Sequence, residues 1–79
     1  MIQTPYVGQI VLYQSLGSTG GEYLPEARAA IITEVPGRTD DTPPDTVGLC
    51  VFNPEGWFLK RGVLYAPEPN PGHWHLLPE

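Results

Sequence analysis

Three basic side chains carry most of the chemistry that this sequence offers. Arg28, Lys60 and Arg61 are three of only four Lys and Arg residues in the chain, and each falls in a run of apolar and β-branched residues that predicts a strand. A guanidinium is a planar fork of donors that suits phosphate groups, whereas the lysine ammonium acts as a point charge. Charges placed on strands need partners. We therefore expect either a small anionic ligand, or ion pairs with Glu26, Glu34 or a backbone carbonyl at one end of the fold.

Aromatic residues extend the anionic-ligand hypothesis. Tyr23, Trp57 and Trp74 could stack on the planar bases of a nucleotide-derived ligand while Arg28 and Arg61 hold its phosphates. Trp57 lies beside a turn, and its alternative role is a contact between subunits, because aromatic residues concentrate at the centres of interfaces.

A catalytic cysteine is not favoured by the sequence. Cys50 is the single cysteine, and its neighbours predict a small buried hydrophobic residue near Lys60. A lysine could lower the pKa of a thiol, but a nucleophile also needs a base and an oxyanion site, and the sequence nominates neither. We expect a protein that is not an enzyme and needs no cofactor.

Two groups of residues could suggest a metal. His73 and His75 are two apart, which places both on one face of a strand, but no third ligand accompanies them. Asp40, Asp41 and Asp45 lie in one loop, which lacks the central glycine and terminal glutamate of a calcium loop. We therefore expect no metal site.

Residues 47–65 predict a β-hairpin around the turn Asn-Pro-Glu-Gly at 53–56. With a three-residue loop and a bulge at the glycine, Phe52 would pair with Phe58 and Cys50 with Lys60. Alternation along the two strands then predicts two faces. One face would carry Val47, Leu49, Val51, Leu59, Arg61 and Val63, and the other Cys50, Phe52, Phe58, Lys60 and Leu64. Both faces are largely apolar, so we expect a second chain segment or subunit to cover one of them, with Cys50, Phe52 and Phe58 at an interface.

Length and composition describe a single small domain over residues 1–79. A chain of 79 residues buries only about 60% of its unfolded surface, which favours help from oligomerisation. One cysteine excludes an internal disulfide, residues 1–5 do not resemble a secretory signal, and there is no long apolar run, so we expect a cytoplasmic protein without membrane contact. The net charge of −5 argues against general nucleic-acid binding but leaves room for a small anion in a pocket.

The two ends of the chain carry a family resemblance. Val7-Gly8-Gln9-Ile10-Val11-Leu12-Tyr13 and the closing Pro71-Gly72-His73-Trp74-His75-Leu76-Leu77-Pro78-Glu79 resemble small uncharacterised proteins of tailed bacteriophages and prophages that have SH3-like barrels. The middle loops match no pattern of that group, so no ligand residues carry over. By analogy with oligomeric phage "sponges", the resemblance implies a homo-oligomer that sequesters a nucleotide signal of host antiviral systems such as CBASS or Thoeris.

The fold that we expect is all-β: a small five-stranded, SH3-like, partly open barrel, with strands near 6–14, 26–35, 47–53, 57–65 and 73–77. Residues 15–25 would form a loop at the rim of the ligand site, and 36–46 a solvated loop. The expected function is non-enzymatic capture of a cyclic dinucleotide or cyclic ADP-ribose type of signal in the cytoplasm of a host bacterium. The alternative is an SH3-like module that binds an extended or proline-rich peptide of a host or virion protein.

Overall fold

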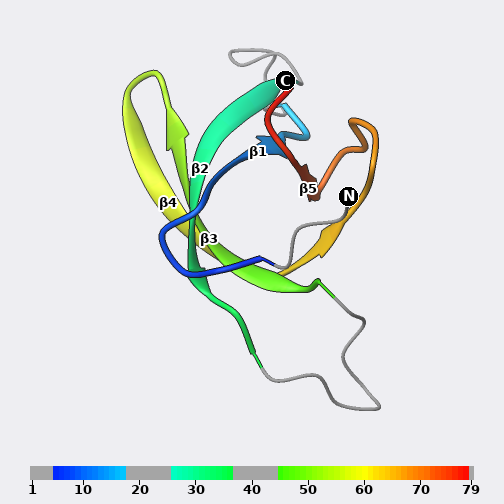
Figure 1. Ribbon diagram of the computed structural model, residues 1–79. Coiled ribbons are helices and arrows are strands. Elements are labelled where there is room, and N and C mark those ends of the chain that lie inside the picture. Colours follow the sequence, from blue (N-terminus) through cyan, green and yellow to red (C-terminus); the bar gives the residue numbers. More distant parts are fainter. Residues whose placement is uncertain (1–4, 18–25, 37–44, 79) are drawn as a thin grey trace.

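Five strands close into a small barrel (Figure 1). The computed structural model describes residues 5–17, 26–36 and 45–78. The strands are β1 (Ile10–Gln14), β2 (Ala27–Glu34), β3 (Val47–Asn53), β4 (Gly56–Tyr65) and β5 (His73–His75). They follow one another around the barrel in chain order, and β5 completes the ring by pairing with both β4 and β1. The predicted all-β, five-stranded small barrel is confirmed, although the barrel is closed instead of partly open. The described residues contain no helix that could span a membrane.

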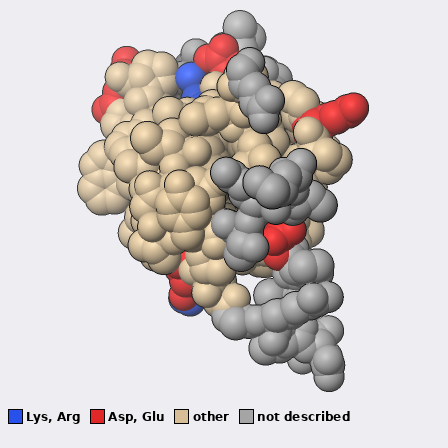
Figure 2. All heavy atoms as spheres, in the orientation of Figure 1, with Lys and Arg blue, Asp and Glu red and all other residues tan. Residues whose placement is uncertain are grey.

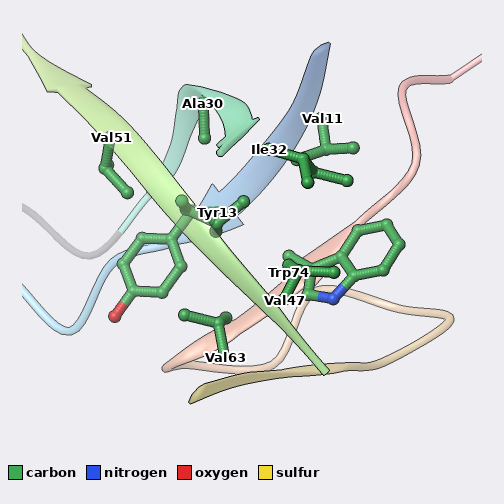
Figure 3. Packing of buried hydrophobic residues seen from close by; sticks show 9 residues of the cluster. Val11, Tyr13, Ala30, Ile32, Val47, Val51, Val63 and Trp74 are labelled. Atoms are coloured by element: carbon green, nitrogen blue, oxygen red, sulfur yellow. The ribbon is translucent and has the colours of Figure 1, made fainter. Parts of the chain in front are cut away.

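The core is built from the alternating positions of these strands. Each strand contributes residues that are almost fully buried, because one side of a closed sheet faces the barrel interior. Figure 3 shows their side chains converging on one another. The cluster consists of Val11, Tyr13, Ala30, Ile32, Val47, Leu49, Val51, Val63 and Trp74. On the side of the molecule shown in Figure 2, charged side chains lie toward the margins and uncharged residues form the middle.

Trp74 on β5 holds the barrel closed. It lies opposite Tyr13 of β1 and Tyr65 of β4, and its ring centroid is 4.9 Å from that of Tyr65. Its side chain is 1% exposed, and its Nε1 donates a hydrogen bond of 2.9 Å to the carbonyl oxygen of Asp45, just before β3. The indole therefore connects β5 with β1, β4 and Asp45, shortly before the start of β3. Because it is buried in the core, it cannot stack on a ligand, contrary to the prediction.

The β3–β4 hairpin differs from the predicted register by one residue. Asn53 pairs with Gly56 and Val51 with Phe58, so the loop has two residues instead of three. The predicted bulge at Gly56 is absent; the extra residue lies farther along β4, near Gly62, whose φ of +67° suits a bulge glycine.

This shift exchanges the two faces of the first half of β4. Leu59 and Arg61, which we expected beside Leu49, point outward, whereas Phe58 packs against the core instead of lying at an interface. The bulge restores Val63 to the interior opposite Val47, as predicted. The other predicted core positions of β3 are also confirmed.

His75 makes the stability of the fold sensitive to mild acid. It is 9% exposed, its Nδ1 has no hydrogen-bond partner among the described residues, and burial lowers the pKa of its imidazole from the ordinary 6.5. The unfolded chain therefore binds this proton more readily than the folded chain. The stabilisation is complete above about pH 6.5 and is lost as the pH falls through the lowered folded-state pKa.

We expect the urea midpoint of unfolding to decrease when the pH is lowered from 7.5 to 5.5. Most carboxylates stay ionised over this range. His75→Gln should remove most of that fall, whereas His73→Gln, two residues away on the same strand, should keep it. An unchanged pH dependence in His75→Gln would contradict this account.

Candidate functional site

A cavity of about 210 Å³ opens at one end of the barrel, and we call it the barrel-mouth cavity. It lies where β1 ends, β2 begins and the β3–β4 hairpin turns. Its lining consists of Tyr13, Ser15, Leu16, Gly17, Arg28, Asn53, Phe58 and Lys60. Strand register explains this grouping: Tyr13 lies directly opposite Arg28, while Phe58 and Lys60 occupy successive inward positions of β4.

Two basic side chains line the barrel-mouth cavity. Arg28 is buried, and its Nη1 lies 2.8 Å from Oε1 of Glu26, a residue that is about half exposed. The Nζ of Lys60 lies 6.0 Å from the centroid of the Tyr13 ring. The backbone N–H of Glu26 donates to the Ser15 Oγ, and the Ser15 N–H donates to the Glu26 carbonyl, which fixes the rim between β1 and β2.

Aromatic rings form the apolar part of the lining. Tyr13 and Phe58 meet edge to face, with centroids 6.4 Å apart and an interplanar angle of 81°. Asn53 adds an amide with both donor and acceptor groups. Cations, an amide and aromatic rings in one cavity suit an anion that carries a planar or apolar portion.

Arg61 lies outside this cavity, contrary to the predicted ligand set. Its Nε and Nη2 donate to the two carboxylate oxygens of Glu34 at 3.0 and 2.9 Å on the outside of the barrel. The hydrogen bond to Glu34, and then the charge of that carboxylate, raise the pKa of the guanidinium. Arg28 pairs with Glu26 and Arg61 pairs with Glu34, so the ion pairs that we considered as the alternative to ligand binding are confirmed.

The other predicted site residues are dispersed. Trp57 is 64% exposed on the outside of β4, and Trp74 is in the core. Cys50 and Phe52 lie on the outer side of β3, where an interface was expected. Tyr23 lies outside the described residues. Of the predicted ligand set, the structure therefore brings only Arg28 and Lys60 together.

Sequence reasoning missed Tyr13, Asn53 and Phe58 as lining residues. The correct register would have identified Phe58, because a two-residue loop turns it inward with Lys60. Tyr13 could have been recognised as the last large inward residue of the first strand. Its position opposite Arg28 depends on the pairing of β1 with β2, which the local sequence does not specify.

Neither metal hypothesis gains a ligand set from the described residues, in which no three His, Cys, Asp or Glu side chains cluster. The Nδ1 of His73 lies 3.0 Å from the carbonyl oxygen of Pro71, and His75 is buried on β5. Asp40 and Asp41 lie outside the described residues.

Comparison with known proteins adds no assignment. No protein family model matches the chain, and neither a curated protein nor a solved structure matches it. The resemblance to small phage proteins therefore stays a prediction, and functional reasoning depends on the barrel-mouth cavity itself.

Proposed function

We propose that this protein is a non-enzymatic binding protein that captures a small anionic ligand of the nucleotide-derived class in the barrel-mouth cavity. The observation that carries the proposal is that Arg28 and Lys60, two of only four Lys and Arg residues, line one cavity with aromatic walls. Because the chain as a whole carries a net charge of −5, these two positive charges favour binding of an anion in the cavity over binding elsewhere on the surface.

Glu26 sets the condition for binding. Its carboxylate already contacts Nη1 of Arg28, so an incoming phosphate competes with it for the guanidinium. This exchange is feasible because Glu26 is about half exposed and can turn to solvent, while Arg28 stays buried. Lys60 lines the same cavity and adds a second positive charge.

The size of the cavity limits what it encloses. Its volume of about 210 Å³ is below the roughly 300 Å³ at which typical ligand pockets begin. We infer that one phosphate and an adjoining sugar or ring enter, and that the rest of a cyclic dinucleotide or cyclic ADP-ribose type of ligand lies over the open mouth. In the setting that the phage resemblance implies, holding such a signal would withhold it from a host receptor without turnover.

The test is a binding panel of cyclic dinucleotides, cyclic ADP-ribose isomers and mononucleotides, measured by calorimetry and equilibrium dialysis. We expect at least one compound to bind and to be recovered unchanged. Arg28→Gln should weaken binding by at least about tenfold, because it removes a charge-assisted hydrogen bond worth about 1.5–3 kcal/mol. Arg61→Gln, which removes an arginine outside the cavity, is the matched control and should bind like the wild type.

Glu26→Gln keeps the proposal testable if Arg28→Gln does not fold. Removing the competing carboxylate leaves Arg28 in place, so affinity for the same compound should rise by a few fold. Absence of binding across the panel, or equal affinity in Arg28→Gln and Arg61→Gln, would overturn the proposal.

A further inference from the structure

We propose that two copies of this chain pair through the outer face of β1–β4, and we define this outer face by two rows of side chains. The first row is set by direct strand pairing and consists of Ile10, Ile31, Cys50 and Leu59. The second row consists of Leu12, Ala29, Phe52 and Trp57. Both rows cross all four strands without a charged residue, and Arg61, which also points outward, is paired with Glu34.

The exposed apolar area of the outer face is about half of what each partner buries in a stable dimer. Leu59 is 66% exposed, Trp57 64%, Ile10 55% and Phe52 40%. With whole side chains of about 150–250 Å², these four residues present roughly 450 Å² of apolar surface. A stable interface buries about 800 Å² on each partner, so these four residues can supply at most about half of it, because the closed barrel curves between β1 and β4. A patch of this size matches the largest apolar patch of a typical monomer, which is often a functional surface.

The shape of the outer face fits a second copy of itself. Large side chains stand on β3 and β4, where Phe52 pairs with Trp57, whereas β2 presents the small, exposed Ala27 and Ala29. A two-fold axis through the middle of the face would place the aromatic side chains of one copy over the alanines of the other. An isologous interface requires both the projections and the shallow region to lie on one surface, and this face has both.

Dimerisation through the outer face is independent of ligand capture. The barrel-mouth cavity is lined by inward residues, whereas the two rows point outward. Each copy would keep its own cavity, so loss of the dimer should leave the Arg28 site intact. Because each copy carries a net charge of −5, added salt should strengthen the dimer by screening repulsion and by favouring apolar burial.

Sedimentation velocity across a concentration series, up to about 1 mM, tests this proposal. We expect a dimer for the wild-type chain. Leu59→Glu, which places a carboxylate in the first row, should weaken the dimer by at least about a hundredfold. The matched control is Leu77→Glu, because Leu77 is a 47% exposed leucine of the tail, outside the outer face; this variant should remain dimeric.

Circular dichroism and cooperative urea unfolding should show that both variants are folded. Should Leu59→Glu fail to fold, Trp57→Ser provides the same test at an exposed position at the start of β4. A wild-type monomer at the highest concentration, or a folded Leu59→Glu variant that dimerises like the wild type, would overturn the proposal. Ligand binding by the monomeric variant separates this outcome from failure of the proposed capture function.

Discussion

Trp74→Ala is expected to remove a large part of the stability of the barrel. Removing a buried tryptophan costs about 3–5 kcal/mol, and a chain of 79 residues has a total stability of only about 4–12 kcal/mol. The effect should be at the upper end of this range, because Trp74 joins β5 to β1 and β4 and its Nε1 also satisfies the Asp45 carbonyl. Without the indole, the pairings of β5 with β1 and with β4 both lose their main packing contact.

Urea unfolding followed by far-UV circular dichroism measures this loss. Trp74→Phe should lose less, because it keeps an aromatic ring in the core and gives up mainly the hydrogen bond, worth about 1 kcal/mol. Trp57→Ala, at dilute protein concentration, is the control for tryptophan content, and at an exposed position it should change stability by about 0.5 kcal/mol or less. Similar midpoints for Trp74→Ala and Trp57→Ala would show that β5 does not close the core.

Gly48→Ala is expected to destabilise the barrel by about 1–3 kcal/mol through overpacking. A Cβ at position 48 would lie 3.0 Å from the Glu34 Cβ, 3.2 Å from its Oε1 and 3.4 Å from the Thr33 Oγ1. The two distances to Glu34 are shorter than ordinary van der Waals contacts, and the first involves an atom attached directly to the backbone of β2. Glu34 would have to move, which would also disturb its two hydrogen bonds with Arg61.

Gly56→Ala is the matched control for this effect. A Cβ at Gly56 would meet nothing within 4 Å, and this glycine does not have a positive φ. Its unfolding midpoint should therefore stay close to that of the wild type, while that of Gly48→Ala falls. Equal midpoints in the two variants would contradict the close packing of β2 against β3 at this position.

Local composition was sufficient to predict the five strands. Runs such as 47–53 and 57–65 are rich in β-branched and aromatic residues, and all five predicted strand regions overlap strands of the structure. The segment 26–35, whose alanines also allow a helix, forms β2, because pairing with β1 and β3 on both sides outweighs helix propensity.

The register of the hairpin could not be read from the turn sequence. Asn-Pro-Glu-Gly allows a loop of two or three residues, and Gly56 suggested the longer loop with its bulge. The bulge instead lies near Gly62, so the inward positions of β4 change between Lys60 and Val63. This single difference moved Arg61 out of the predicted site and brought Phe58 into it.

The candidate site was only partly predictable for a related reason. Arg28 and Lys60 could be identified as strand-borne charges, but their common cavity arises from long-range pairing around a closed sheet. Nothing in the sequence separation of Arg28 and Lys60 indicates that they lie close together in space. The acidic partners Glu26 and Glu34 were foreseen, because charges on strands require compensation close by.

Amide chemical-shift mapping of the isotope-labelled protein during titration with the best compound of the binding panel tests the central claim most directly. Capture at the barrel mouth predicts that the largest changes occur at Tyr13, Arg28, Asn53, Phe58 and Lys60, and that the same changes are absent in Arg28→Gln. Saturable changes centred instead on Arg61 and Trp57, with the barrel-mouth residues unaffected, would contradict it.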